Sequence, residues 1–247
     1  MNAPSSVVIT GASSGIGEAI ARRFAADGAQ LTLGSRTPAP PLDGARWIQT
    51  DVADPTSVQA LIDAAVATHG RIDVVVNNAG VQVEKTIAET TDADYDHVMD
   101  VNVRGVFNCC RAAVRQMQQQ ESGVIINIGS VAASTADHGM AIYNASKGAV
   151  QSLTRAIAID HGRDGIRCNA VAPGWIMTAL ADAAFDLADD PSAARDAATA
   201  KHPVGRMGTP EDVAELTCWL AGPAASYVSG SVFTIDGGLT AQSPIEP

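Results

Sequence analysis

Cysteine is scarce in this chain, and long apolar runs and a surplus of positive charge are missing. No window approaches eighteen uninterrupted apolar residues, so we expect no transmembrane helix and no membrane partner. The first residues carry no basic segment ahead of an apolar run, which predicts a cytoplasmic protein rather than a secreted one. Four cysteines without a Cys-x-x-Cys pair do not make a disulfide scaffold, and we expect them to be small core residues: Cys109, Cys110, Cys168 and Cys218.

The charge balance excludes further classes of function. The formal net charge is −11 and no stretch is rich in lysine or arginine, so phosphate backbones are repelled and we expect no nucleic-acid partner. The five histidines show no metal-ligand spacing with one another or with carboxylates, so we expect no metal. A small-molecule substrate is the remaining expectation.

What the chain does contain is a regular alternation of short apolar runs and longer helical patterns. Continuous β-branched runs between helices indicate a parallel sheet covered on both faces, in an α/β, doubly wound, Rossmann-type fold of about seven strands. Its length fits one domain over residues 1–247. The predicted strands are 7–10, 31–33, 47–49, 74–76, 124–128, 167–171 and 232–235. The predicted helices are 16–27, 57–68, 92–119, 141–161, 178–200 and 211–220.

Two segments depart from this alternation. The run Pro38-Ala39-Pro40-Pro41 lies where a helix is expected between the second and third strands, and we interpret it as a loop that replaces or shortens that helix. The Ala/Asp-rich stretch 179–200 is either a solvated surface helix or part of a substrate lid. We place the predicted lid around residues 178–207.

A glycine-rich turn joins the first predicted strand to the first helix. Gly11, Gly15 and Gly17 are spaced G-x-x-x-G-x-G, and glycine there lets backbone N–H groups approach a phosphate at the positive end of a helix. The spacing differs from the common dinucleotide pattern G-x-G-x-x-G.

Tyr143 and Lys147 are separated by one helical turn and share a helix face. A nearby ammonium group favours the phenolate, which predicts a tyrosine that exchanges protons near neutral pH. Taken alone, a tyrosine and a lysine at this spacing are usually an ordinary surface pair.

Further motifs follow in a fixed order along the chain: Asp51-Val52, Asn77-Asn78-Ala79-Gly80, Met99–Gly105, Ile126–Ser130 and Pro173–Thr178. Together with the glycine turn and the Tyr143 pair, they resemble the short-chain dehydrogenase/reductase family over essentially the whole chain. The cofactor-binding positions that this resemblance implies are Gly11, Ser14, Gly15, Ile16, Gly17, Ser35, Arg36, Asp51, Val52, Asn78, Ala79, Gly80, Tyr143, Lys147, Pro173, Gly174, Ile176 and Thr178.

The resemblance also implies catalytic roles for Asn102, Ser130, Tyr143 and Lys147. Tyr143 supplies or removes the proton, and Ser130 donates a hydrogen bond to the substrate oxygen. Lys147 lowers the pKa of Tyr143 and binds the ribose hydroxyls of the nicotinamide. Asn102 perturbs its helix and positions a water that passes protons to Lys147.

Cofactor choice depends on the end of the second strand. A carboxylate there is typical of NAD sites, whereas an arginine accommodates the 2′-phosphate of NADP. Here Ser35 takes the carboxylate position and Arg36 follows, so we expect NADP, with NAD as the alternative in which Arg36 merely stacks on the adenine. Ser14 weakens the NADP case, because many NADP-using relatives carry a basic residue at that point.

The expected activity is hydride transfer between the nicotinamide cofactor and a small, fairly apolar alcohol or ketone. Residues expected along the substrate pocket include His138, Met140, Leu180, Phe185 and Leu187, with His138 interpreted as a surface-loop residue rather than an extra acid/base. Two alternatives are a non-catalytic dinucleotide-binding regulatory protein and a different reaction, such as epimerisation, on the same fold. The resemblance implies a homo-oligomer, a tetramer in many relatives.

Overall fold

The computed structural model describes residues 5–186 and 188–242 and contains one seven-stranded sheet. Every neighbouring pair of strands is parallel, and the strand order is β3-β2-β1-β4-β5-β6-β7. This confirms the predicted doubly wound fold. The strands are β1 (Ser6–Thr10), β2 (Gln30–Ser35), β3 (Ala45–Gln49), β4 (Val74–Asn77), β5 (Gly123–Ile128), β6 (Ile166–Pro173) and β7 (Val232–Ile235).

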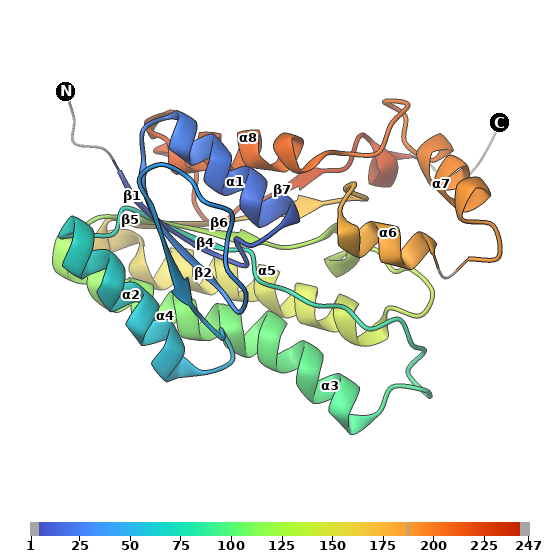
Figure 1. The fold of residues 1–247 in the computed structure, drawn as a ribbon, viewed down its shortest axis with the longest axis horizontal. Helices are drawn as coiled ribbons and strands as arrows, with labels where there is room; N and C mark the ends of the chain where they lie inside the picture. The colour runs from blue at the N-terminus through green and yellow to red at the C-terminus, as the bar shows by residue number, and fades with distance from the viewer. Residues whose placement is uncertain (1–4, 187, 243–247) are drawn as a thin grey trace.

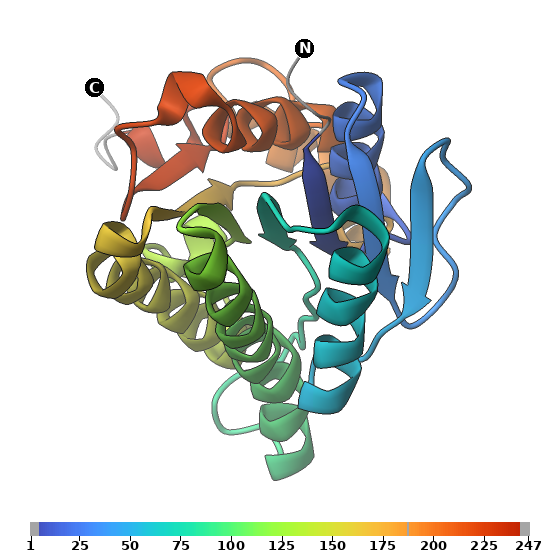
Figure 2. The same cartoon turned by 90° about the vertical axis from the view of Figure 1, so that its left-hand side faces the viewer.

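Helices cover both faces of the sheet (Figures 1 and 2). One face carries α1 (Gly15–Ala26) and α8 (Pro210–Ala221), which pack against each other. The opposite face carries α2 (Pro55–His69), α4 (Val106–Gln120) and α5 (Ala141–His161). Strand order reverses beside β1, and ligands of such sheets bind at that point beyond the carboxyl ends of the strands.

The central strands bury apolar side chains on both faces, which explains their continuous apolar runs. In β1, Val8 belongs to the core under α2, α4 and α5, whereas Val7 and Ile9 belong to the core under α1 and α8. All three side chains are fully buried. Side chains alternate across a strand, so a run without polar gaps fills both cores.

The chain between β2 and β3 forms a loop over residues 36–44 with no helix, as the proline run predicts. Proline at positions 38, 40 and 41 removes backbone donors that a helix needs. The short connection leaves β3 at the edge of the sheet, where its residues are only partly buried.

The helix predicted over 92–119 is present, but its middle part is π-helical rather than α-helical. It consists of α3 (Asp92–Met99), a π-helical segment η1 (Asp100–Gly105) and α4. A π-turn widens the helix by one residue, and such turns concentrate at functional sites. Gly105 ends the segment against Val52, and a Cβ at this glycine would lie 2.6 Å from the valine side chain.

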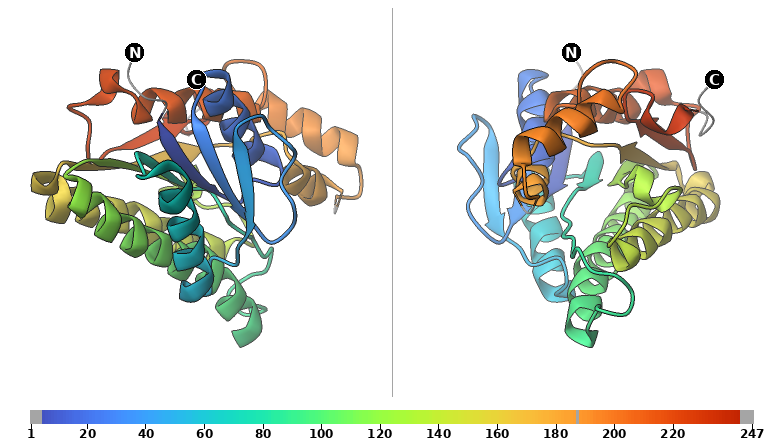
Figure 3. Two further views of the ribbon diagram at one scale, coloured as in Figure 1. Left: turned by 60° about the vertical axis from the view of Figure 1, so that its left-hand side comes forward. Right: turned by 90° about the vertical axis from the view of Figure 1, so that its right-hand side faces the viewer.

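The prediction of a single helix over 178–200 is wrong, because the structure divides the stretch into α6 (Ala179–Phe185) and α7 (Pro191–Ala200). Asp190 caps α7 by accepting a hydrogen bond from Ala193 N at 3.0 Å, and Pro191 occupies the first helical position. An Asp-Pro pair starts a helix and cannot continue one. Both helices lie together at one end of the molecule (Figures 1 and 3).

Among the described helices, none combines the length and the apolar character that crossing a bilayer requires.

Candidate active site

The turn between β1 and α1 is packed so closely that it leaves no room for side chains at two glycines. Gly11 has φ +65°, and a Cβ there would lie 2.8 Å from the backbone of Ala79. A Cβ on Gly17 would collide with the carbonyl oxygen of Gly11 and with the side-chain amide of Asn78. The same amide donates hydrogen bonds to the carbonyl oxygens of Thr10 and Gly11 at 3.1 and 3.0 Å. Glycine at these positions therefore lets the ends of β1 and β4 approach each other closely at the point where the strand order reverses.

A cavity of about 800 Å³ extends along the carboxyl ends of the strands. That volume lies within the range of ligand and cofactor sites. Of the predicted site residues, all but Gly17 and Asn102 line it. Gly17 packs behind the glycine turn, and Asn102 is buried behind the wall of the cavity.

The end of β2 places Ser35 and Arg36 at the cavity. The Ser35 hydroxyl is hydrogen-bonded within the protein, whereas Arg36 is exposed. Ser35 is buried, and its hydroxyl donates to the carbonyl oxygen of Thr37 at 2.6 Å while it accepts from Trp47 Nε1 at 3.0 Å. The single proton of the Ser35 hydroxyl is therefore already donated within the protein and is not available to a 2′-phosphate. Arg36 is exposed along the cavity.

Tyr143 at the start of α5 meets Ser130 at the end of β5. The Ser130 hydroxyl accepts a hydrogen bond from Ala132 N at 3.1 Å, and Ser130 and Tyr143 line the cavity together. Burial raises the pKa of Tyr143, and the neighbouring Ser130 hydroxyl opposes that rise. In this structure desolvation dominates and the pKa of Tyr143 lies above its ordinary value, and the lowering expected from Lys147 stays a prediction.

Lys147 is buried one turn further along α5. Its Nζ donates to the carbonyl oxygen of Ile128 at 3.0 Å and lies 5.6 Å from the centre of the Tyr143 ring. Burial lowers the pKa of Lys147 to about 8, because an ammonium group loses hydration that one carbonyl does not replace. The lysine therefore titrates close to neutral pH.

Asn102 lies in the π-helical segment η1 and holds the chain that follows β4. It donates to Val81 O at 2.8 Å and accepts from Val81 N at 2.8 Å. It also donates to the Ser146 hydroxyl at 3.0 Å, and this hydroxyl donates to the carbonyl oxygen of Tyr143 at 2.7 Å. Ser146 is fully buried and was not among the predicted site residues. Its position one residue before Lys147 was the only signal available in the sequence.

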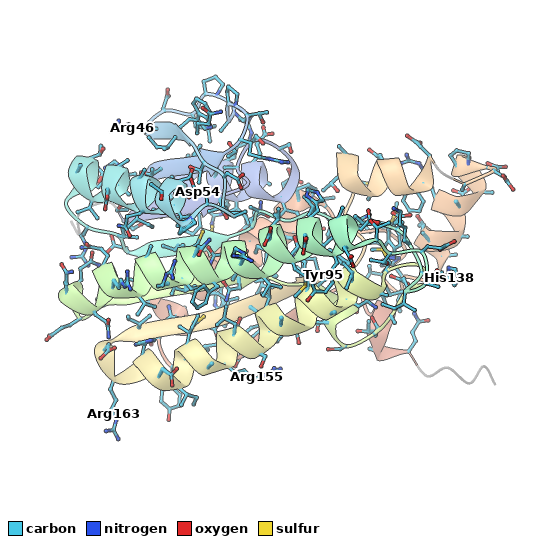
Figure 4. All side chains as sticks on the ribbon, turned by 90° about the horizontal axis from the view of Figure 1, so that it is seen from below. Arg46, Asp54, Tyr95, His138, Arg155 and Arg163 are labelled. Atoms are coloured by element: carbon cyan, nitrogen blue, oxygen red, sulfur yellow. The ribbon has the colours of Figure 1, made fainter. Side chains whose placement is uncertain are left out.

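The remaining part of the cavity faces α6 and the loops before α5. His138, Met140 and Phe185 line it as predicted, and His138 is an exposed residue at the end of the molecule where α6 and α7 lie (Figure 4). Leu187 and the side chain of Leu180 lie outside the described residues. The cavity is also lined by residues that the sequence did not single out for the site, among them Ser13, Gln82, Glu84, Asp137 and Trp175.

The cavity fits a nicotinamide dinucleotide on geometric grounds. Gly15 has φ +57°, and a Cβ there would meet only the Thr178 side chain, so the backbone at the start of α1 is open to the cavity. Ser14 precedes this helix without capping it through its side chain, which leaves the first helical N–H groups for a pyrophosphate. At the other end, Ser130 and Tyr143 converge where a reacting carbonyl oxygen would sit.

Comparisons with known proteins agree with this site. The sequence model of a family described as enoyl-(acyl carrier protein) reductase matches residues 11–240. The 2-(R)-hydroxypropyl-CoM dehydrogenase of Xanthobacter autotrophicus is 42% identical over an alignment 248 residues long, which covers 95% of this chain and 98% of that protein. The chain belongs to the short-chain dehydrogenase/reductase family. It is accordingly an oxidoreductase that uses a nicotinamide cofactor.

Solved structures of this family share its fold closely. The aldohexose dehydrogenase of Thermoplasma acidophilum superposes with a TM-score of 0.94 at 35% identity, over 99% of this chain and 97% of that one. The structure of ElxO with NADP bound gives a TM-score of 0.89 at 30% identity, over 97% of this chain and 100% of that one.

Proposed function

We propose that this protein is an NADP(H)-dependent alcohol dehydrogenase or carbonyl reductase that acts on small, uncharged and fairly apolar substrates. The observation that carries the proposal is the convergence of the Tyr143 phenol and the Ser130 hydroxyl in one cavity, where Ser130 is close enough to influence the pKa of Tyr143. A proton donor and a second hydrogen-bond donor at one point are what reduction of a carbonyl requires.

Each catalytic residue has a role that its position supports. A bound nicotinamide supplies or accepts the hydride. Tyr143 gives its proton to the developing alkoxide or takes it from the alcohol, and Ser130 donates to the same oxygen. Lys147, with its lowered pKa, binds the nicotinamide ribose and restores the proton on Tyr143. Asn102 and Ser146 hold the Tyr143 turn and the Val81 loop in register.

Charge at the cavity favours an uncharged substrate. Among the lining residues that the structure describes, the basic ones are Arg36, beside the end of β2, Lys147, behind Tyr143, and the exposed His138. Asp51, Glu84 and Asp137 add three carboxylates. An anionic substrate would meet net repulsion and no dedicated cation, whereas a neutral ketone or alcohol avoids both effects.

NADP is supported by Arg36 and by the absence of a carboxylate at the end of β2. The guanidinium is exposed at the cavity and can pair bidentately with a 2′-phosphate. Ser35 contributes by its neutrality, because its proton is held by Thr37. A solved relative, ElxO, binds NADP.

The test is a panel of neutral, cationic and carboxylated ketones and alcohols, each offered with NADP(H) and with NAD(H) while reduced nicotinamide is followed by absorbance. Turnover of neutral members, with higher kcat/KM for NADP(H), is the expected result. Cofactor binding without turnover of any member would instead favour the non-catalytic alternative. That alternative has no support from the two dehydrogenases named above.

We also propose a cytoplasmic homo-tetramer. Trp219 on α8 is 44% exposed and packs edge-on against Phe233 of β7, an apolar surface suited to a second copy of the chain. Light scattering after gel filtration tests the assembly, and a monomer at working concentrations would contradict it.

A further inference from the structure

Phe185 is buried although it belongs to a short helix at the periphery of the molecule. Its side chain is 6% exposed and lines the cavity. The ring stacks on Trp175, with centroids 5.2 Å apart and planes inclined by 27°. Trp175 also lines the cavity, in the segment that follows β6. The two rings therefore form an aromatic wall of the cavity.

Arg195 of α7 contacts Phe185, one of the two residues that form this wall. Its guanidinium carbon lies 5.2 Å from the centre of the Phe185 ring. Its Nη1 pairs with Asp182 at 2.6 Å, and its Nη2 lies 3.8 Å from Asp186. Asp182, Phe185 and Asp186 are spaced i, i+3 and i+4, and Asp186 directly follows α6 in helical conformation, so the three lie on one face. One planar cation thus serves two carboxylates and an aromatic ring, which a lysine cannot do.

Little else attaches α7 to the protein. None of the residues of α7 is buried, so no apolar anchor ties this helix to the sheet. The chain on either side is better fixed, because Ile176 pairs with Gly208 in a β-bridge and Met177 N donates to Gly208 O at 2.9 Å. Without Arg195, two carboxylates one turn apart on α6 would also repel each other.

We propose that Arg195 is a positioning residue for substrate binding, and that Trp175 and Phe185 are the specificity-determining residues it positions. The Arg195 cluster consists of Trp175, Asp182, Phe185, Asp186 and Arg195. It holds the aromatic wall in the position along the cavity that the structure shows. The wall selects substrates whose carbonyl carries an apolar group large enough to contact it. This inference rests on the proposed function for its kinetic consequence but not for its structural one.

Arg195→Gln tests the cluster, and Arg71→Gln is the matched control. Arg71 also pairs with an aspartate at 2.6 Å, but it lies before β4, at the end of the sheet away from the cavity. Hydrogen exchange is measured in the absence of substrate over peptides covering 179–186 and 191–200. Arg195→Gln should speed exchange in both by at least about fivefold, since these helices lose their shared cation. The control should leave both unchanged.

Steady-state kinetics then compare a ketone bearing a cyclohexyl or phenyl group with acetone. For the larger ketone, Arg195→Gln should raise KM about tenfold with kcat within about twofold, while the KM of acetone stays the same. Phe185→Leu should do likewise, and adding Arg195→Gln to it should have little further effect because both changes remove the same contact. Added salt should raise the KM of the wild type toward that of Arg195→Gln.

Unchanged exchange in 179–186 after Arg195→Gln would overturn the proposal, and so would a loss of kcat with KM unchanged. The proposal would also be overturned if Arg195→Gln raised the KM of the larger ketone by the same factor in the Phe185→Leu variant as in the wild type. If no carbonyl is turned over by the wild type, the proposed function fails, and the exchange experiment still decides whether the cluster exists.

Discussion

At the scale of single residues, the proposed preference for NADP rests on Arg36. Arg36→Ala should weaken NADP(H) binding by about 1.5–3 kcal/mol, as for a charge-assisted hydrogen bond, and barely affect NAD(H). Ser35→Asp should move the preference further toward NAD(H), because the carboxylate accepts from the ribose 2′-OH and repels the phosphate. Titration of each variant with both cofactors measures the shift. An equal loss of both would make Arg36 an adenine-stacking residue and remove the case for NADP.

Lys147 should leave a signature in the pH dependence of stability. Its pKa is about 8 in the folded protein, against about 10.4 in an unfolded chain. Between these values the unfolded chain binds the extra proton, so the free energy of unfolding rises with pH across this window, by on the order of 3 kcal/mol. Urea unfolding without cofactor at several pH values should show that Lys147→Met lacks this rise. Identical pH slopes in the two proteins would contradict the lowered pKa of the buried Lys147.

At the scale of elements, Ser146 connects the π-helical segment to the start of α5. Ser146→Ala should cost about 1–2 kcal/mol of stability, because Asn102 and the Tyr143 carbonyl each lose a buried partner. It should also lower kcat, because the π-helical segment that carries Asn102 and the helix that carries Tyr143 lose the hydrogen bonds that connect them. Ser152→Ala, an exposed serine on the same helix, is the control and should change neither quantity. Equal behaviour of the two variants in unfolding and kinetic assays would refute the connecting role.

Strands and helices differ in how far the sequence predicts them. Each predicted strand agrees with the structure to within two residues at either end, because an apolar run buried on both faces has few alternatives. Two long predicted helices differ from the structure for local reasons, since 178–200 is divided in two and the middle of 92–119 is π-helical. Asp190-Pro191 carried a readable signal for a helix start, whereas the π-turn at Asp100–Gly105 depends on packing of Gly105 against Val52, fifty-three positions away.

At the scale of the whole molecule, the cofactor end of the site was more predictable than the substrate end. Glycine turns and the Tyr143 pair are short motifs whose spacing is visible in the sequence, and they line the cavity together. The Arg195 cluster brings together Trp175, Phe185 and Arg195, which come from the segment after β6, from α6 and from α7. Contacts of this kind arise only when the chain folds, as does the desolvation that raises the pKa of Tyr143.

The central claim is that Tyr143 exchanges the proton while the cofactor exchanges the hydride. The most direct measurement is turnover by Tyr143→Phe, made together with titration of NADP(H) binding to the same protein. The account predicts that cofactor binding is retained and that kcat falls at least about a hundredfold, the lower range for general acid–base catalysis. A folded Tyr143→Phe protein with near-wild-type turnover would contradict it.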